Sequence, residues 1–191
     1  MRRTTSLFVA LSLLLGGTAL AGIGSDATAR TSQERLELAR FLKAQNIHSL
    51  PEYVKWFEQH MTYRPDGQRD NWARPLDTLL RQGGDCEDLA FLNKAMIALF
   101  GIEGRVLGTR RGDEHHVFLV FEYAGRIFIF DNTRCIRTKA HSLDDIAAFL
   151  YRKYEIDYVL EVENSPRHIR VLYDSFTLRG YARGPLPVPA S

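Results

Sequence analysis

The chain has 191 residues, of which 45% are hydrophobic, 25% charged and 11% aromatic, as in one ordinary globular domain. It contains no internal repeat and no low-complexity run, which argues against a fibrous or disordered protein. The 25 basic and 23 acidic residues form no basic stripe with interleaved aromatic side chains, so we expect no nucleic-acid partner.

The N-terminal residues 1–21 have the pattern of a secretory signal peptide. Arg2 and Arg3 precede an apolar run from Leu7 to Leu15, and residues 19–21 fit the small-x-small cleavage pattern. The run is shorter than the roughly 20 residues that span a bilayer, so no stable membrane anchor is expected. Cleavage near Ala21 would leave 23 basic and 23 acidic residues. The sequence therefore predicts a periplasmic or secreted protein.

One domain is predicted over residues 33–180. Residues 22–32 are small and polar and predict a flexible N-terminal segment, whereas residues 181–191 contain three prolines and predict an extended or disordered tail. Apolar residues at helical spacing predict helices over residues 33–44, 50–61, 75–81 and 86–100.

The second half of the chain predicts an antiparallel sheet. Residues 115–133 are rich in aromatic and β-branched side chains around Ala124-Gly125, which predicts a β-hairpin. Residues 155–163 and 168–175 predict two more strands, and Ser142 is the expected N-cap of a helix that precedes them. The expected fold class is α+β, with N-terminal helices packed on a sheet of at least four strands.

Cys86 lies in the stretch "RQGGDCEDLA" (81–90), at the start of a predicted helix. Unpaired N–H groups and the helix dipole at that end favour a thiolate and suit an oxyanion. Asp85, Glu87 and Asp88 act in the opposite direction, because like charge raises the pKa of a thiol. These acids either stabilise the first turn of the helix or bind a cation such as calcium. His116 could also carry the proton and hold the thiolate as an ion pair despite them.

The hairpin register places a histidine beside an aspartate. With a two-residue turn at Ala124-Gly125, Asp131 faces Phe118, and His116 becomes its diagonal neighbour on the same side of the sheet. A three-residue turn would favour His115 instead. Cys86, His116 and Asp131 are therefore the predicted catalytic triad.

Cys135 leaves two alternatives open. In an oxidising compartment it could pair with Cys86, which would give a redox-locked site. The other interpretation is a small buried apolar residue with a free thiol, as is common for cysteine.

Residues 70–97, "DNWARPLDTLLRQGGDCEDLAFLNKAMI", resemble the bacterial transglutaminase-like cysteine proteinases (LapG-like) of the transglutaminase-like/papain-like superfamily. Trp72, Pro75 and Leu79 precede the Gly-Asp-Cys-Glu-Asp core, "HVFLV" starts at His116, and "FDNT" starts at Phe130. The resemblance implies a papain-like fold, the same triad and a periplasmic location. It also implies a protein substrate in the periplasm or at the cell surface, and calcium binding by Asp85 and Glu87.

The leading functional hypothesis is an exported cysteine peptidase or amide hydrolase that forms a thioester acyl-enzyme and requires no cofactor for its chemistry. One alternative is a transglutaminase or glutamine deamidase that uses the same triad. The other is a non-catalytic or redox-locked binding module.

Overall fold

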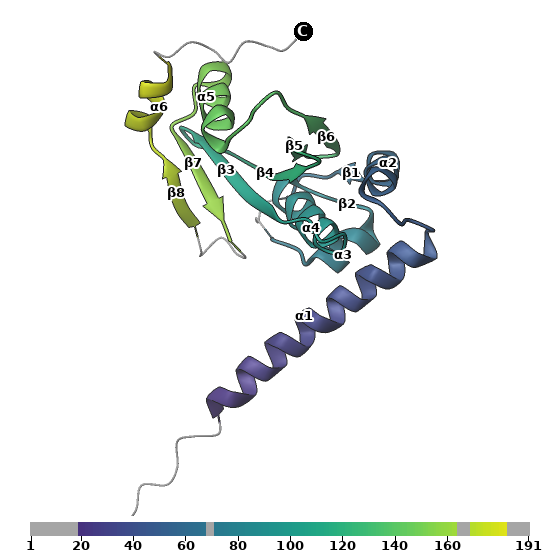
Figure 1. The fold of residues 1–191 in the computed structure, drawn as a ribbon. Helices are drawn as coiled ribbons and strands as arrows, with labels where there is room; N and C mark the ends of the chain where they lie inside the picture. Colours follow the sequence, from purple (N-terminus) through teal and green to yellow (C-terminus); the bar gives the residue numbers. More distant parts are fainter. Residues whose placement is uncertain (1–18, 68–70, 164–168, 183–191) are drawn as a thin grey trace, which may run out of the picture. The chain divides into compact units, whose positions relative to one another are not determined.

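The computed structural model describes residues 19–67, 71–163 and 169–182 (Figure 1). The chain divides into two compact units, Met1–Gln33 and Glu34–Ser191. The predicted signal peptide lies outside the described residues except for its last three positions, and so does the predicted tail from residue 183 onward. No helix within the described ranges is long and apolar enough to cross a membrane.

The first helix, α1 (Ala19–Ala44), begins earlier than the sequence predicted. A helix was expected only from residue 33, after a flexible segment over residues 22–32, and the structure gives helix to that segment as well. The physical reason is that extending an existing helix forms one hydrogen bond for each residue fixed, and residues 22–32 contain no proline to stop it.

Two further helices and a short parallel pair of strands lead to the cysteine. Helix α2 (Leu50–His60) begins at the N-cap Ser49, and α3 (Pro75–Arg81) agrees with its predicted range. Between and after them lie β1 (Thr62–Tyr63) and β2 (Gly83–Gly84), which pair in parallel. Helix α4 (Cys86–Ala98) follows β2 after the N-cap Asp85, so this pairing holds the chain just before α4.

Six strands form the main sheet in the order β6-β5-β4-β3-β7-β8, and every neighbouring pair is antiparallel. The strands are β3 (Gly104–Arg111), β4 (Glu114–Tyr123), β5 (Arg126–Asp131), β6 (Arg134–Arg137), β7 (Tyr158–Val162) and β8 (Ile169–Tyr173). Helix α5 (Leu143–Tyr154) connects β6 to β7, and α6 (Ser175–Ala182) follows β8. The α+β prediction is confirmed.

The β4–β5 hairpin has the two-residue turn that the sequence predicted. Tyr123 pairs with Arg126 and Leu119 pairs with Phe130. Ala124 and Gly125 both have positive φ, 51° and 69°, which is the conformation of a type I′ hairpin turn. This turn sets the register that brings the ends of β4 and β5 together.

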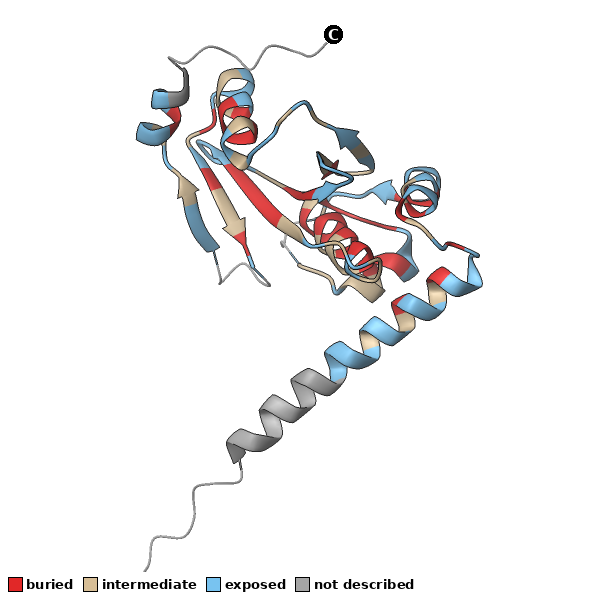
Figure 2. Ribbon diagram, viewed as in Figure 1, coloured by how far each residue is buried: buried red, intermediate tan, exposed pale blue. Residues whose placement is uncertain are grey.

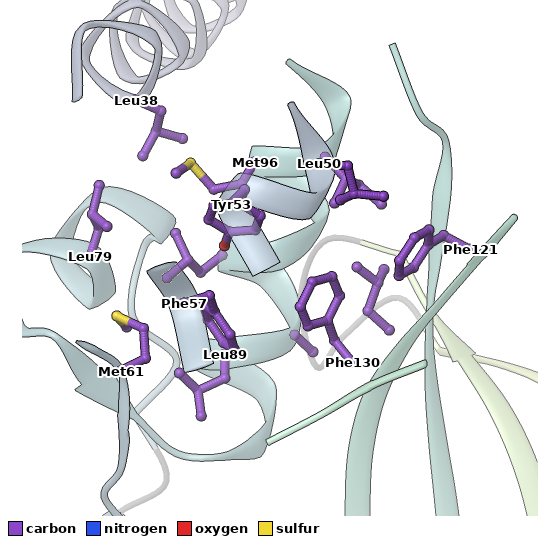
Figure 3. Packing of buried hydrophobic residues seen from close by; sticks show 14 of the residues in the cluster. Leu38, Leu50, Tyr53, Phe57, Met61, Leu79, Leu89, Met96, Phe121 and Phe130 are labelled. Atoms are coloured by element: carbon purple, nitrogen blue, oxygen red, sulfur yellow. The ribbon is translucent and has the colours of Figure 1, made fainter. Parts of the chain in front are cut away.

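The sheet carries a hydrophobic cluster on each face, because successive side chains of a strand point to opposite sides. Leu119 and Phe121 of β4 belong to the cluster that contains α4, together with Tyr53 and Phe57 of α2 (Figure 3). Phe118 and Val120 belong to the cluster that contains α5. Buried residues therefore follow α4 and the middle of β3 and β4 (Figure 2).

Candidate active site

Cys86 is the first residue of α4, as the sequence predicted. Asp85 is the N-cap, and its side chain accepts a hydrogen bond from the backbone N–H of Asp88 at 3.5 Å. Parallel pairing of Tyr63 with Gly84 holds the chain immediately before this cap. The cysteine thus lies at a helix N-terminus that is fixed on both sides by hydrogen bonds.

Asp88 ties the segment around Ala73 to α4. Its side chain is 2% exposed, and it accepts hydrogen bonds from the backbone N–H of Ala73 at 2.6 Å and from Arg81 Nη2 at 3.4 Å. Burial raises the pKa of Asp88. A Cβ atom on Gly84 would lie 2.5 Å from Asp88 Cβ, so only glycine fits there without displacement. The Gly-Asp-Cys-Glu-Asp core is therefore partly a folding motif.

The Cys86 thiol donates a hydrogen bond to Glu87 Oε2 at 3.0 Å. Burial raises the pKa of Cys86 to about 12, with further increases from the Glu87 carboxylate and from Asp85, while a hydrogen bond with the Val117 backbone acts to lower it. The acids and burial thus outweigh the helix terminus, and Cys86 is a neutral thiol at pH 7 in this state.

His116 and Asp131 form the pair that the register predicted. His116 Nε2 lies 2.8 Å from Asp131 Oδ1, and both side chains are partly exposed. The His116 ring also stacks on Phe118, with 6.0 Å between ring centroids. His115 pairs with Arg110 across β3 and β4, and alternation points its side chain to the other face. The two-residue turn therefore selects His116 as the partner of Asp131.

The third contact of the predicted triad is not formed, because the Cys86 thiol and the His116 imidazole are each hydrogen-bonded to another residue. The thiol reaches β4 at the backbone of Val117, the residue after His116, and α4 packs against β4. Its hydrogen bond goes to Glu87 and not to the imidazole. Because Nε2 of His116 is occupied by Asp131, Nδ1 is the ring nitrogen left to accept a proton.

Cys86 and Cys135 are both free thiols, so the disulfide alternative is not what this structure shows. Cys135 is half-buried and packs against the cluster that contains α4. Its backbone N–H donates to Glu58 Oε1 at 2.9 Å, and burial raises the pKa of its thiol to about 12. This agrees with the interpretation of Cys135 as a small buried residue.

Calcium was expected at Asp85 and Glu87. Calcium takes six to eight oxygen ligands. Within the described ranges, no group of three or more His, Cys, Asp or Glu side chains lies close enough to hold a metal ion. Asp85 caps α4 and Glu87 accepts the thiol hydrogen bond, so the described side chains do not form a ready-made calcium site.

Sequence reasoning missed Tyr63, which the fold places beside the nucleophile. Burial raises the pKa of Tyr63, and negative charge at Cys86, Asp85 and Glu87 raises it further, although 45% of the residue is exposed. Tyr63 lies on a two-residue strand whose parallel partner follows α3. Such a short pairing has no periodic signal in the sequence.

Three buried polar side-chain atoms have no hydrogen-bond partner among the described residues. They are Trp72 Nε1, next to Phe91 of α4, Asn93 Nδ2 on α4 itself, and Asn132 Oδ1, in the turn after Asp131. Gln82 ends α3 in the left-handed conformation, and its side chain is exposed.

No family model matches this chain, and no curated protein matches it. Among solved structures, Legionella pneumophila LapG has 16% sequence identity and a TM-score of 0.42, with 67% of this chain and 70% of that chain covered. Its calcium-bound form has 16% sequence identity and a TM-score of 0.41, with 62% of this chain and 65% of that chain covered. A candidate cysteine protease from Cytophaga hutchinsonii has 17% sequence identity and a TM-score of 0.36, with 65% of this chain and 48% of that chain covered.

Proposed function

We propose that this protein is an exported cysteine peptidase that cleaves an amide bond of a protein substrate through Cys86, His116 and Asp131. The observation that carries the proposal is the hydrogen bond between His116 Nε2 and Asp131 Oδ1, at 2.8 Å, on the strand that the Cys86 thiol reaches. Nucleophilic catalysis needs an imidazole held by a carboxylate and a cysteine at a helix N-terminus, and this chain has both. In the resting state the thiol reaches only the backbone of Val117, so we propose that substrate binding brings Sγ and the imidazole together.

The proposed reaction starts from the neutral thiol. His116 Nδ1 takes the thiol proton, Cys86 Sγ bonds to the substrate carbonyl carbon, and the backbone N–H of Cys86 stabilises the oxyanion. The C–N bond then breaks, the amine leaves with the proton from His116, and a thioester remains. Water attacks the thioester with His116 as the base, and the carboxylic acid leaves as the thiol re-forms. Asp131 keeps the proton on Nε2 throughout, so that Nδ1 acts as the base.

Substrate binding must break the hydrogen bond from Cys86 to Glu87 before this reaction begins. The bond, at 3.0 Å, holds the proton on the side of a buried carboxylate. The resting enzyme is thus expected to be weakly reactive and to gain reactivity when a substrate moves the thiol toward His116.

Export is proposed from the signal-peptide pattern of residues 1–21. Calcium is proposed only as an ion that Asp85 and Glu87 would bind. Its binding is measured by calorimetry with calcium chloride on the full chain. A Glu87→Gln variant that binds calcium as tightly as the unmodified chain would exclude this assignment.

The proposed function is tested with a denatured protein substrate and the purified full chain. We expect new N-termini in the products, loss of cleavage in Cys86→Ala, and a mass increase on Cys86 that corresponds to the acyl group when the reaction is quenched early. Cleavage that persists in Cys86→Ala would refute the proposal.

The same assay separates hydrolysis from acyl transfer. A primary amine is added in excess, and the products are analysed by mass spectrometry. Free carboxylic acid as the main product supports the peptidase, whereas amide formed with the added amine would identify a transglutaminase.

A further inference from the structure

A cavity of about 1080 Å³ lies on the face of the sheet that α5 covers. It is lined by residues of β3 to β6, by the β6–α5 connection and by α5 itself. His116 and Asp131 both line it, so the cavity is continuous with the proposed catalytic pair. Its volume is slightly above the roughly 300–1,000 Å³ of small-molecule sites, which suits a chain segment with more than one side chain.

The cavity wall is apolar and carries large hydrophobic side chains that the fold does not bury. Ile136 is 46% exposed, Phe149 is 48% exposed and Tyr154 is 45% exposed, and all three line the cavity. Exposed apolar residues that gather in one place indicate a binding surface rather than chance. A partner with an apolar side chain would remove this surface from water.

The charges around the cavity are mainly positive. Five lining residues are cationic: Arg111, Arg137, Lys139, Arg152 and Lys153. Three are acidic, and two of those have partners: Asp131 binds His116, and Asp145 accepts the backbone N–H of His141. Two of the cations have partners as well, since Arg111 pairs with Glu155 and Arg152 donates to the Ala148 carbonyl. The whole chain carries a formal charge of only +2, so this concentration is local and does not follow from composition.

Lys153 brings positive charge to the apolar part of the cavity wall. Its Nζ lies 4.7 Å from the centre of the Tyr154 ring and 5.5 Å from the centre of the Phe149 ring. These cation–π contacts hold a positive charge directly at the apolar rim. An apolar side chain bound there would have its neighbouring residues beside cationic groups.

We propose that this cavity binds a segment of the polypeptide substrate in which an apolar side chain is flanked by Asp or Glu. The inference rests on the proposed function and adds the substrate class. Charge complementarity selects this occupant, because a basic segment would face like charge at the rim.

The test measures binding without turnover, on the full chain carrying Cys86→Ala. Two short fluorescent peptides are compared by anisotropy: one has Phe and Leu at its centre with Glu on both sides, and the other has Lys in place of every Glu. We expect the acidic peptide to bind about tenfold more tightly. Equal affinities, or a preference for the basic peptide, would overturn the inference.

Two variants locate the effect. Arg137→Glu with Lys139→Glu reverses charge at the cavity and should abolish the preference for the acidic peptide. Lys55→Glu with Arg126→Glu makes the same change of net charge at exposed positions that do not line the cavity, and should leave the preference intact. An equal loss in both double variants would mean a general charge effect and would overturn the inference.

A third variant does not depend on charge or on correct folding of the double variants. Phe149→Ala truncates an exposed side chain and should weaken the binding of both peptides severalfold. Unchanged binding would overturn the apolar part of the inference. Because all binding is measured on Cys86→Ala, a failure of catalysis in the unmodified chain is seen separately, as absence of cleavage with selective binding retained.

Discussion

Cys86 Sγ lies 3.0 Å from Glu87 Oε2, and among the neighbouring side chains Glu87 does most to disfavour the Cys86 thiolate. Burial is the largest cause of the raised pKa of Cys86, and the Glu87 carboxylate comes next. The residue after the nucleophile thus keeps the thiol protonated until something displaces it.

Glu87→Gln should lower the pKa of Cys86. Removal of a negative charge next to the thiolate stabilises the thiolate, so we expect the midpoint of alkylation to fall by about one pH unit or more. The measurement is the rate of iodoacetamide labelling of Cys86 against pH, read by mass spectrometry. Cys135 serves as the internal control, because burial and Glu58, and not Glu87, raise the pKa of its thiol. An unchanged or higher midpoint would contradict this account.

His116→Ala and His115→Ala form a matched pair of adjacent substitutions. His116, and not His115, forms the hydrogen bond with Asp131, so His116→Ala should abolish cleavage while His115→Ala retains most of it. General acid–base catalysis contributes typically 10²–10⁴-fold, which sets the expected size of the loss. Cleavage of a protein substrate is the readout. Equal losses in the two variants, or a loss confined to His115→Ala, would refute the assignment.

Gly84→Ala should destabilise the protein and disturb the site together. The new Cβ would lie 2.5 Å from Asp88 Cβ, and relief of this clash must move the carboxylate that binds the Ala73 N–H. We expect a loss of about 1–3 kcal/mol in the free energy of unfolding, measured by urea denaturation. Gly67→Ala is the control, because a Cβ there meets no atom within 4 Å. Similar stability in both variants would show that the close approach at Gly84 is not essential.

Glu161→Gln should lower stability in a pH-dependent way. Glu161 accepts two hydrogen bonds from Arg105, at 2.7 and 3.0 Å, and another from Arg170. These contacts lower the pKa of Glu161 to about 2. Because the folded-state pKa is depressed, the stabilisation is fully present above the ordinary pKa of 4.5 and is lost as the pH falls toward 2.

The expected difference between Glu161→Gln and the unmodified chain is about 1–3 kcal/mol at pH 7, and it should shrink toward zero near pH 2. Chemical denaturation at a series of pH values measures it. Glu122→Gln, at an exposed position of β4, should change stability by less than about 0.5 kcal/mol. A difference for Glu161→Gln that is constant across this range would contradict the assigned cause.

Much of the local structure could be predicted because it depends on neighbouring residues. The helix over residues 75–81 follows from a proline at its first turn and two glycines after its end. The β4–β5 register follows from a two-residue turn with positive φ, which Gly125 favours and Ala124 tolerates. The pairing of His116 with Asp131 was a consequence of that register alone.

Strand β3 was missed, although it lies near the centre of the sheet. Its sequence, "GRVLGTRR", has two glycines and three arginines and no clear alternation. Gly104 is there because a Cβ would lie 2.8 Å from side-chain atoms of both Ile97 and Leu119. Such a residue is selected by how closely α4 approaches the sheet, and that distance is a property of the packed structure.

The sequence by itself determined the helix that starts at Cys86, the hairpin and the pairing of His116 with Asp131, since each depends on residues close together in the chain. Only the tertiary structure decided the protonation state of the Cys86 thiol. Burial, the Glu87 carboxylate and the Val117 backbone act on it together, and the net effect depends on how α4 packs against β4. The cavity beside α5 likewise exists only where helix and sheet meet, because its wall combines residues from elements far apart in the chain.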